Sequence, residues 1–173
     1  RRMVGVVTQE PCLYTDLTGE ENVRFFGRLY GVGGERLEKK SEELLELVKL
    51  KGREKDLVGT YSGGMRQRLS IVCALVHDPR IIFFDEPTAG LDPQTKRAIW
   101  GFMKGLQKRG ITVVLSTHYM EEADALSDRV AIMDRGRIVA VDRPKRLKES
   151  LSGVEEPTLE DVFLSLTGRE MRD

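Results

Sequence analysis

The sequence has few cysteines, no long apolar run and no excess of charge of one sign. Cys12 and Cys73 are its two cysteines, so the chain has no disulfide framework and fits a reducing compartment. Apolar runs such as 81–84 and 111–115 are far shorter than the ~20 residues that span a membrane. The 28 basic residues are balanced by 28 acidic ones, which argues against nucleic acid as a partner.

The composition is that of an ordinary globular domain. Of the 173 residues, 40% are apolar and 32% are charged, which is enough apolar material for one core and excludes intrinsic disorder. The length is close to the ~150 residues expected of one domain.

Hydrophobic spacing and capping residues predict alternating strands and helices. Strands near 81–84, 111–116 and 130–133 alternate with helices, the pattern of a parallel α/β sheet with right-handed crossovers, and a further short buried strand is predicted near 3–8. The unbroken apolar run 81–84 predicts a strand covered on both faces. The short turn 134–137 predicts that strands 130–133 and 138–141 are antiparallel and lie at an edge of the sheet. Residues 15–60 read as a small helical lobe.

Two adjacent carboxylates, Asp85 and Glu86, follow the buried strand 81–84 directly. Open α/β sheets bind ligands at the carboxyl ends of their strands. One carboxylate there can hold Mg²⁺ through oxygen ligands, and its neighbour can orient or deprotonate an attacking water. Acids also follow strands as helix caps or solvated turns, so this motif alone leaves both interpretations open.

Ser62-Gly63-Gly64 stands where a helix begins. A serine N-cap, two glycines that let a ligand approach the backbone, and free N–H groups at a helix N-terminus make an anion site. Arg66 and Arg68 follow at once and add positive charge. An ordinary serine cap after a flexible turn is the other interpretation.

Three further segments are unremarkable when taken singly. Gln9 follows the first strand, Asp92 has the spacing of a helix N-cap after Ala89-Gly90-Leu91, and His118 follows the strand 111–116. A loop amide, a cap and a hydrogen-bonded loop histidine explain each of them separately. They do not explain why five such elements occur in one order, most of them at the same edge of the sheet.

That order resembles the nucleotide-binding domain of ATP-binding cassette (ABC) proteins over nearly the whole chain. Gln9 matches the Q-loop, Ser62-Gly63-Gly64 the signature motif, Asp85-Glu86 the Walker B motif, Ala89-Gly90-Leu91-Asp92 the D-loop and His118 the switch histidine. The resemblance implies a P-loop NTPase-like α/β fold, a parallel sheet core with an inserted helical lobe. It implies ATP and Mg²⁺ as substrate and cofactor.

The resemblance also assigns roles to these residues. It implies that Asp85 and Gln9 reach Mg²⁺, that Glu86 is the general base and that His118 contacts the γ-phosphate. Ser62, Gly63 and Gly64 would bind the γ-phosphate of a nucleotide held by a second such domain in a head-to-tail dimer, and the D-loop residue Asp92 would also be nucleotide-binding. A helix N-terminus without a lysine is half of a phosphate site, which fits that arrangement.

The sequence departs from the family in three places. Tyr61 and Met65 replace the usual leucine and glutamine that flank Ser-Gly-Gly. The Walker A loop, Gly-x-x-x-x-Gly-Lys-Ser/Thr, is absent, because no glycine in the chain is followed by lysine. That loop supplies most of the direct contacts to the β- and γ-phosphates. We therefore expect weak or no nucleotide binding by this chain and no ATP hydrolysis by the chain alone.

The resemblance divides the chain into four segments. Residues 1–14 would hold a core strand and the Q-loop, 15–75 the helical lobe with the signature, 76–142 the α/β core with Walker B, D-loop and switch histidine, and 143–173 the closing helices. The expectation is an N-terminally incomplete domain without its first strands and phosphate-binding loop, since Arg1-Arg2-Met3 reads as the middle of a domain.

Two segments resemble the exporter branch that includes daunorubicin-resistance-type ATPases: the stretch 120–124 and the tail 157–163. This branch implies an ATP-hydrolysing subunit that drives export through a transmembrane permease, in the cytoplasm and peripheral at the inner face of the cell membrane. One alternative is a non-catalytic partner that lends Ser62-Gly63-Gly64 to a complete domain. Another is a soluble ABC ATPase that takes no part in transport.

Overall fold

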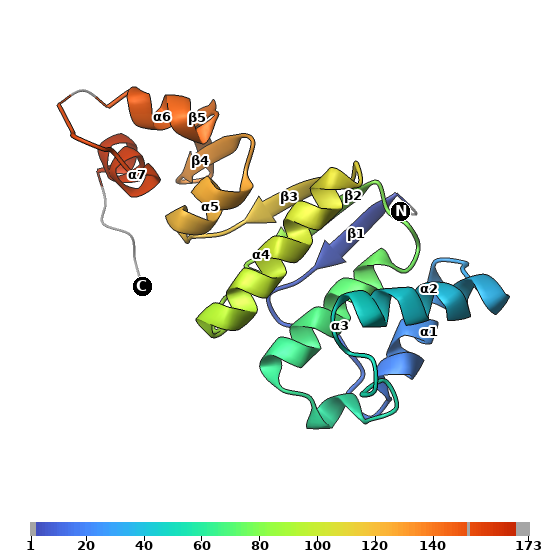
Figure 1. The fold of residues 1–173 in the computed structure, drawn as a ribbon. Coiled ribbons are helices and arrows are strands. Elements are labelled where there is room, and N and C mark those ends of the chain that lie inside the picture. Colours follow the sequence, from blue (N-terminus) through green and yellow to red (C-terminus); the bar gives the residue numbers. More distant parts are fainter. Residues whose placement is uncertain (1–2, 152, 169–173) are drawn as a thin grey trace. The chain divides into compact units, whose positions relative to one another are not determined.

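The computed structural model describes residues 3–151 and 153–168 and divides into two compact units, Arg1–Ser116 and Thr117–Asp173 (Figure 1). Arg1 and Arg2, on which part of the expectation of an incomplete start rested, lie outside the described residues. The four-segment division stays a prediction, and each unit is described by itself below.

The first unit is built on a three-stranded parallel sheet in the order β1-β2-β3. The strands are β1 (Val4–Val7), β2 (Ile81–Asp85) and β3 (Thr112–Ser116). Val7 pairs with Phe84, and Asp85 pairs with Ser116, so all three strands end at one edge. The parallel sheet expected from the alternation of strands and helices is confirmed for the strands at 81–84 and 111–116, and the strand near 3–8 belongs to the same sheet.

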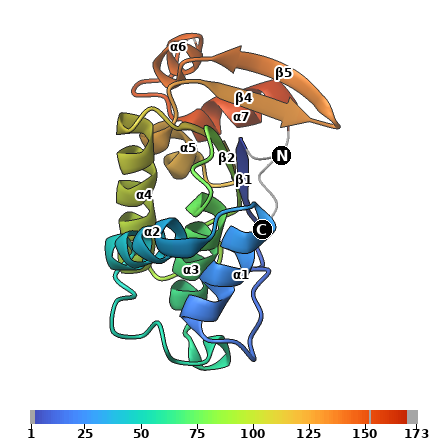
Figure 2. The ribbon, with the colours of Figure 1, turned by 90° about the vertical axis from the view of Figure 1, so that its right-hand side faces the viewer.

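One face of this sheet is covered and the other is not. Ile82 and Phe84 are fully buried on the face that α3 and α4 pack against (Figure 2). On the opposite face Val6, Phe83 and Val114 are neighbours across the three strands and are 56%, 42% and 41% exposed. Within the described residues of the first unit, the expectation of a strand covered on both faces is therefore wrong, because no helix of this unit lies over the second face.

The helices of the first unit begin and end at the capping signals. They are α1 (Gly19–Leu29), α2 (Gly34–Leu47), a 3-10 turn (Val58–Thr60), α3 (Gly63–Leu75) and α4 (Pro93–Lys108). Thr18 and Glu21 form the capping box of α1, with the Glu21 carboxylate 2.8 Å from the Thr18 N–H. Together α1, α2 and the first part of α3 form the helical lobe.

Gly5 is fixed by close packing between β1 and α3. A Cβ atom at Gly5 would lie 2.5 Å from the carbonyl oxygen of Ala74 and 3.3 Å from Cγ of Pro79. We expect Gly5→Ala to lower the free energy of unfolding by about 2–3 kcal/mol, because the backbone of α3 has to shift. Gly101→Ala is the matched control: that helical position has nothing within 4 Å, and alanine should stabilise by about 0.5–1 kcal/mol. Urea denaturation measures both, and a Gly5→Ala chain as stable as wild type would contradict the packing.

The second unit holds an antiparallel hairpin and three helices. The elements are α5 (Met120–Leu126), β4 (Val130–Asp134), β5 (Arg137–Asp142), α6 (Pro144–Glu149) and α7 (Leu159–Thr167). Their core is formed by Ile132, Leu147, Leu159 and Val162. The predicted antiparallel pairing is confirmed. The predicted place at an edge of the parallel sheet is wrong, because β4 and β5 pair with each other in a separate two-stranded sheet.

None of the helices in the described ranges is long and apolar enough to cross a membrane.

Candidate functional site

The strand ends bring Asp85, Glu86 and Ser116 into contact. The Ser116 hydroxyl donates a hydrogen bond to Oδ1 of Asp85 over 2.5 Å, and the Glu86 N–H donates to the Ser116 carbonyl over 3.0 Å. Asp85 is exposed and Glu86 is half-buried. The parallel register thus fixes the two predicted carboxylates at one point of the sheet edge, and Ser116 is a site residue that the motif alone did not reveal.

Glu86 has a strained backbone. Its φ of +46° lies in the left-handed region, which costs a non-glycine residue about 1–2 kcal/mol. The bond from its N–H to Ser116 and the bond from the Ala89 N–H to its carbonyl, 3.1 Å long, hold this conformation. The left-handed conformation turns the chain directly after β2.

Gln9 lies at the same edge of the sheet. It follows β1 by two residues, and the end of β1 pairs with Phe84, directly before Asp85. The loop is held locally, because the Thr8 hydroxyl donates to the Glu10 carbonyl over 2.6 Å. Gln9 itself is exposed. Its predicted reach toward a metal ion and a water stays a prediction.

The Ser62-Gly63-Gly64 turn begins α3 as predicted. The Ser62 hydroxyl accepts from the Met65 N–H over 3.3 Å and so caps the helix. Gly63 is exposed, and a Cβ there would have nothing within 4 Å, so the space beside the first turn of α3 is open at this residue. A Cβ at Gly64 would lie 3.1 Å from Cγ2 of Thr95, so the turn rests against the first turn of α4.

Asp92 joins this second group through Thr95. Its carboxylate accepts from the Thr95 N–H over 3.0 Å and from the Thr95 hydroxyl over 2.6 Å, and these bonds lower the pKa of Asp92. Since Thr95 also contacts Gly64, the D-loop residue and the signature turn are held together at the N-termini of two helices. Thr95 was missed in the sequence analysis. Its place three residues after an Asp N-cap was the available signal.

The oxygen ligands at the strand ends would supply only part of a binding site for Mg²⁺. Mg²⁺ prefers oxygen ligands and is commonly held by one or two carboxylates plus waters and substrate phosphates. Asp85 supplies such a carboxylate, oriented by Ser116. Within the described ranges no three acidic, histidine or cysteine side chains gather into a metal site. The ion would therefore have to arrive with the nucleotide.

Two residues near the signature turn, Arg68 and Tyr61, donate hydrogen bonds to backbone carbonyls. Arg68 was expected to add charge to the anion site, but its guanidinium donates to three backbone carbonyls at 3.0–3.4 Å. Tyr61, in place of the usual leucine, is buried in the lobe and donates to the Arg53 carbonyl over 2.6 Å. Burial raises the pKa of Tyr61. The replacement therefore leaves the turn itself unchanged.

His118 belongs to the second unit. It lies two residues before α5, and its ring centroid lies 4.1 Å from that of Tyr119, the N-cap of that helix. The N–H of Tyr119 donates to the Thr117 hydroxyl over 3.0 Å, which fixes the start of the segment. Asp85 and Glu86 belong to the first unit, so the predicted contact of His118 with the γ-phosphate stays a prediction.

The other histidine, His77, joins the lobe to the sheet. Its ring stacks on Tyr30 at 3.9 Å between centroids, and its Nε2 lies 3.0 Å from the Val4 carbonyl of β1. Because a carbonyl only accepts, Nε2 carries the proton, and the buried Nδ1 has no hydrogen-bond partner. Burial lowers the pKa of His77.

The charged groups around His77 come from the following residue and from α2. Asp78 pairs with Arg36 over 3.1 Å and with Lys40 over 2.5 Å. Burial alone would raise the pKa of Asp78, but its bonds with Lys40 and Arg36 outweigh burial and lower it. Asp78 raises the pKa of His77 less than burial lowers it, so the neutral ring is the folded form near neutral pH.

We expect the stability of the chain to fall as the pH drops below about 6.5. There the unfolded chain takes up a proton on His77 at its ordinary pKa, while the folded chain resists until a lower pH. Asp78 contributes a further loss only in stronger acid, because its folded pKa is lowered. Urea denaturation at pH 7.5 and 5.5 should show a smaller difference for His77→Gln than for wild type. An equal difference would contradict this assignment.

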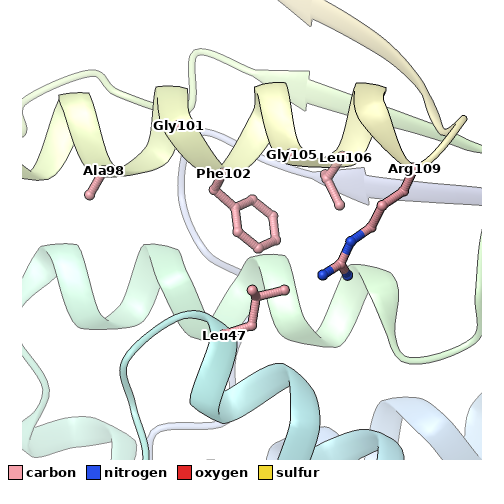
Figure 3. A pocket seen from close by; sticks show the side chains of 7 residues that line it. All are labelled: Leu47, Ala98, Gly101, Phe102, Gly105, Leu106 and Arg109. Atoms are coloured by element: carbon pink, nitrogen blue, oxygen red, sulfur yellow. The ribbon is translucent and has the colours of Figure 1, made fainter.

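A groove lies between the end of α2 and the outer side of α4 (Figure 3). It has a volume of about 250 Å³, and Leu47, Phe102 and Arg109 point into it. No predicted site residue lines it, and it is smaller than the ~300–1,000 Å³ usual for small-molecule sites. The residues predicted to bind nucleotide therefore lie outside this groove, at the strand ends and at the helix N-termini.

Comparison with known families decides the identity. The sequence pattern described as "ABC transporter" matches residues 1–89, which include β1, the helical lobe, the signature turn and both carboxylates. The chain belongs to the ABC transporter family. The predicted P-loop NTPase-like fold and the resemblance to ABC nucleotide-binding domains are thus confirmed.

Curated ABC relatives align over all or most of the chain. It is 42% identical over 173 residues to a doxorubicin resistance ATP-binding protein of Mycobacterium tuberculosis, covering 100% of this chain and 50% of that protein. It is 41% identical over 167 residues to a linearmycin resistance ATP-binding protein of Bacillus subtilis, covering 96% and 51%. A Nod factor export ATP-binding protein of Cupriavidus metallidurans is 35% identical over 228 residues, covering 100% and 75%. The chain thus spans about half the length of the first two of these relatives.

Solved ABC structures share the fold. An ATP-binding subunit of an ABC transporter superposes with a TM-score of 0.83 at 30% identity, covering 96% of this chain and 69% of that one. The cbiO1 protein of Clostridium perfringens, described as part of the cbiONQ transporter complex, gives a TM-score of 0.78 at 27% identity, covering 87% and 61%. This ABC chain is thus a homologue of ATP-binding proteins named for drug resistance and for Nod factor export.

Proposed function

We propose that this chain is part of the ATP-hydrolysing subunit of an ABC exporter and supplies the hydrolytic half of its nucleotide site. Glu86 acts as general base on the attacking water, and Asp85, oriented by Ser116, holds the Mg²⁺ that enters with ATP. Gln9 lies beside them at the sheet edge, and His118 contacts the γ-phosphate. ATP energises the export of a substrate through a membrane permease, and the subunit lies at the cytoplasmic face of the membrane.

The observation that carries this proposal is the contact between Asp85, Ser116 and the strained Glu86. A carboxylate oriented by a hydroxyl, next to a second carboxylate in a left-handed conformation, supports a pair with separate tasks. The signature turn supports the dimer. The space beside its first turn is open at Gly63, and no lysine follows to complete a phosphate site within the chain.

A cluster of exposed aromatic and aliphatic side chains supports the permease as partner. Tyr14 and Phe25 meet edge-to-face at 4.8 Å between ring centroids, and they are 49% and 41% exposed. Leu29, one turn further along α1, is 66% exposed. The buried Asn22 side chain bonds to the backbone of Tyr14 over 2.9 Å in both directions, so the loop after Gln9 holds Tyr14 in place. We propose that a short cytoplasmic helix of the permease docks on Tyr14, Phe25 and Leu29.

The test is co-purification of the tagged protein with the permease from detergent-solubilised membranes of its own host. Phe25→Ser combined with Leu29→Ser should abolish recovery of a multi-spanning permease, because apolar contact is lost. Leu57→Ser is the control, since Leu57 is also 50% exposed but lies outside the cluster. Recovery of no membrane protein with the wild type would favour a soluble ABC ATPase.

A second candidate function rests on the open position at Gly63. The chain would lend Ser62-Gly63-Gly64 to a complete ABC domain without hydrolysing ATP itself. Mixing it with a complete relative, such as the Bacillus subtilis linearmycin resistance protein, would then change that relative's ATP turnover. An unchanged turnover would exclude this candidate.

A further inference from the structure

Arg68 links the signature turn to the end of α2. Its Nε donates to the Gly64 carbonyl over 3.2 Å, and its Nη1 donates to the Val48 and Lys49 carbonyls over 3.0 and 3.4 Å. Gly64 belongs to the signature turn, whereas Val48 and Lys49 directly follow α2 in the helical lobe. One side chain therefore joins two segments that are 15–16 residues apart in sequence.

The end of α2 needs such a donor. The last carbonyls of a helix have no intrahelical partner and carry the negative end of the helix dipole. The last turn of α2 contains no basic residue of its own. Lys49 then turns the chain with a φ of +58°, which leaves the Val48 and Lys49 carbonyls to an outside donor. Arg68 supplies both the hydrogen bonds and the positive charge from a neighbouring helix.

The geometry requires a guanidinium. Its planar fork places Nε and Nη1 in fixed directions, so that one group can reach carbonyls of two different segments. A lysine ammonium has a single nitrogen and cannot span them. No carboxylate in the described part of the chain forms an ion pair with Arg68, and the charge is therefore committed to the three carbonyls.

We propose that Arg68 is a positioning residue, which clamps the signature turn to the end of α2 and so fixes where its backbone N–H groups lie. The clamp itself follows from the contacts above, whereas its consequence for ATP turnover rests on the proposed function.

The first arm of the test is amide hydrogen exchange of the 173-residue chain. Arg68→Met removes the three bonds and keeps a long side chain. We expect about tenfold faster exchange for the Val48 and Leu50 amides, which bond to Leu44 and Leu45. Arg68→Lys should give an intermediate change, since it keeps the charge without the fork. Amides of β2 should be unaffected, which separates local release from general destabilisation.

Arg66→Met is the matched control in this arm. It removes the same charge two residues away, from a side chain that makes none of these bonds, and it should leave the α2 amides unchanged. The clamp is overturned if Arg68→Met leaves the Val48 and Leu50 amides at their wild-type rates. It is also overturned if Arg66→Met accelerates them equally.

The second arm measures ATP turnover in a complemented chain, defined as residues 3–173 preceded by the phosphate-loop segment of the Bacillus subtilis linearmycin resistance relative. Arg68→Met should lower kcat about fivefold or more and leave KM for ATP unchanged, because Arg68 positions the turn without contacting nucleotide. An unchanged kcat would overturn the positioning role. If the unsubstituted complemented chain shows no turnover, the proposed function fails, and the exchange arm still decides the clamp.

Discussion

Replacing Glu86 by glutamine is expected to lower kcat of the complemented chain by about 10²–10⁴-fold, the usual contribution of a general base. Glutamine keeps the size of the side chain and its place on the strained turn, but it cannot accept a proton from the attacking water. Nucleotide binding should persist, because Glu86 is not assigned a phosphate contact. Steady-state phosphate release and nucleotide titration measure the two effects separately.

Glu43→Gln is the control for this prediction. Glu43 is an exposed carboxylate on α2 without an ion pair among the described residues, and its replacement should leave kcat unchanged. A Glu86→Gln variant with wild-type kcat would contradict the role of general base. Loss of nucleotide binding along with turnover would instead place Glu86 in binding.

Gly63→Asp is expected to abolish turnover while leaving the chain as stable as wild type or more stable. A side chain at Gly63 meets nothing within 4 Å, and an acidic residue in the first turn of a helix interacts favourably with the helix dipole. The same carboxylate would repel a phosphate that approaches the N–H groups of α3. We expect kcat of the complemented chain to fall about 100-fold or more, with the urea midpoint unchanged or raised.

Gly33→Asp is the matched control, because Gly33 is the N-cap of α2 and also has open space around it. That substitution adds a capping carboxylate to a helix N-terminus outside the proposed site, and it should leave turnover intact. A Gly63→Asp variant with full turnover would contradict the phosphate contact. A strongly destabilised variant would contradict the open geometry at Gly63.

Local signals were sufficient to predict most elements of the fold. The capping box at Thr18 and the Asp92 N-cap before Pro93 begin helices as expected, because capping depends on residues within one turn. The carboxylate pair could also be located, since an apolar run followed by Asp85 and Glu86 places both at the end of a strand.

Contacts that depend on packing could not be predicted. Ser116 and Thr95 join the site through strand register and helix packing, which follow from residues distant in sequence. Arg68 was assigned to the anion site because it follows the signature turn closely in sequence. Its hydrogen bond to the Val48 carbonyl depends instead on where α2 ends. The open face at Phe83 was missed because an apolar run does not tell how many helices lie over a strand.

The most direct test of the account is steady-state phosphate release from ATP by the 173-residue chain, beside the complemented chain. We propose that this chain contains the hydrolytic residues, whereas the phosphate-binding loop is not among its 173 residues. We therefore expect the chain alone to release phosphate at the background rate. The complemented chain should release phosphate above background, and Glu86→Gln should abolish that release. Release above background by the chain alone, abolished by Glu86→Gln, would contradict it.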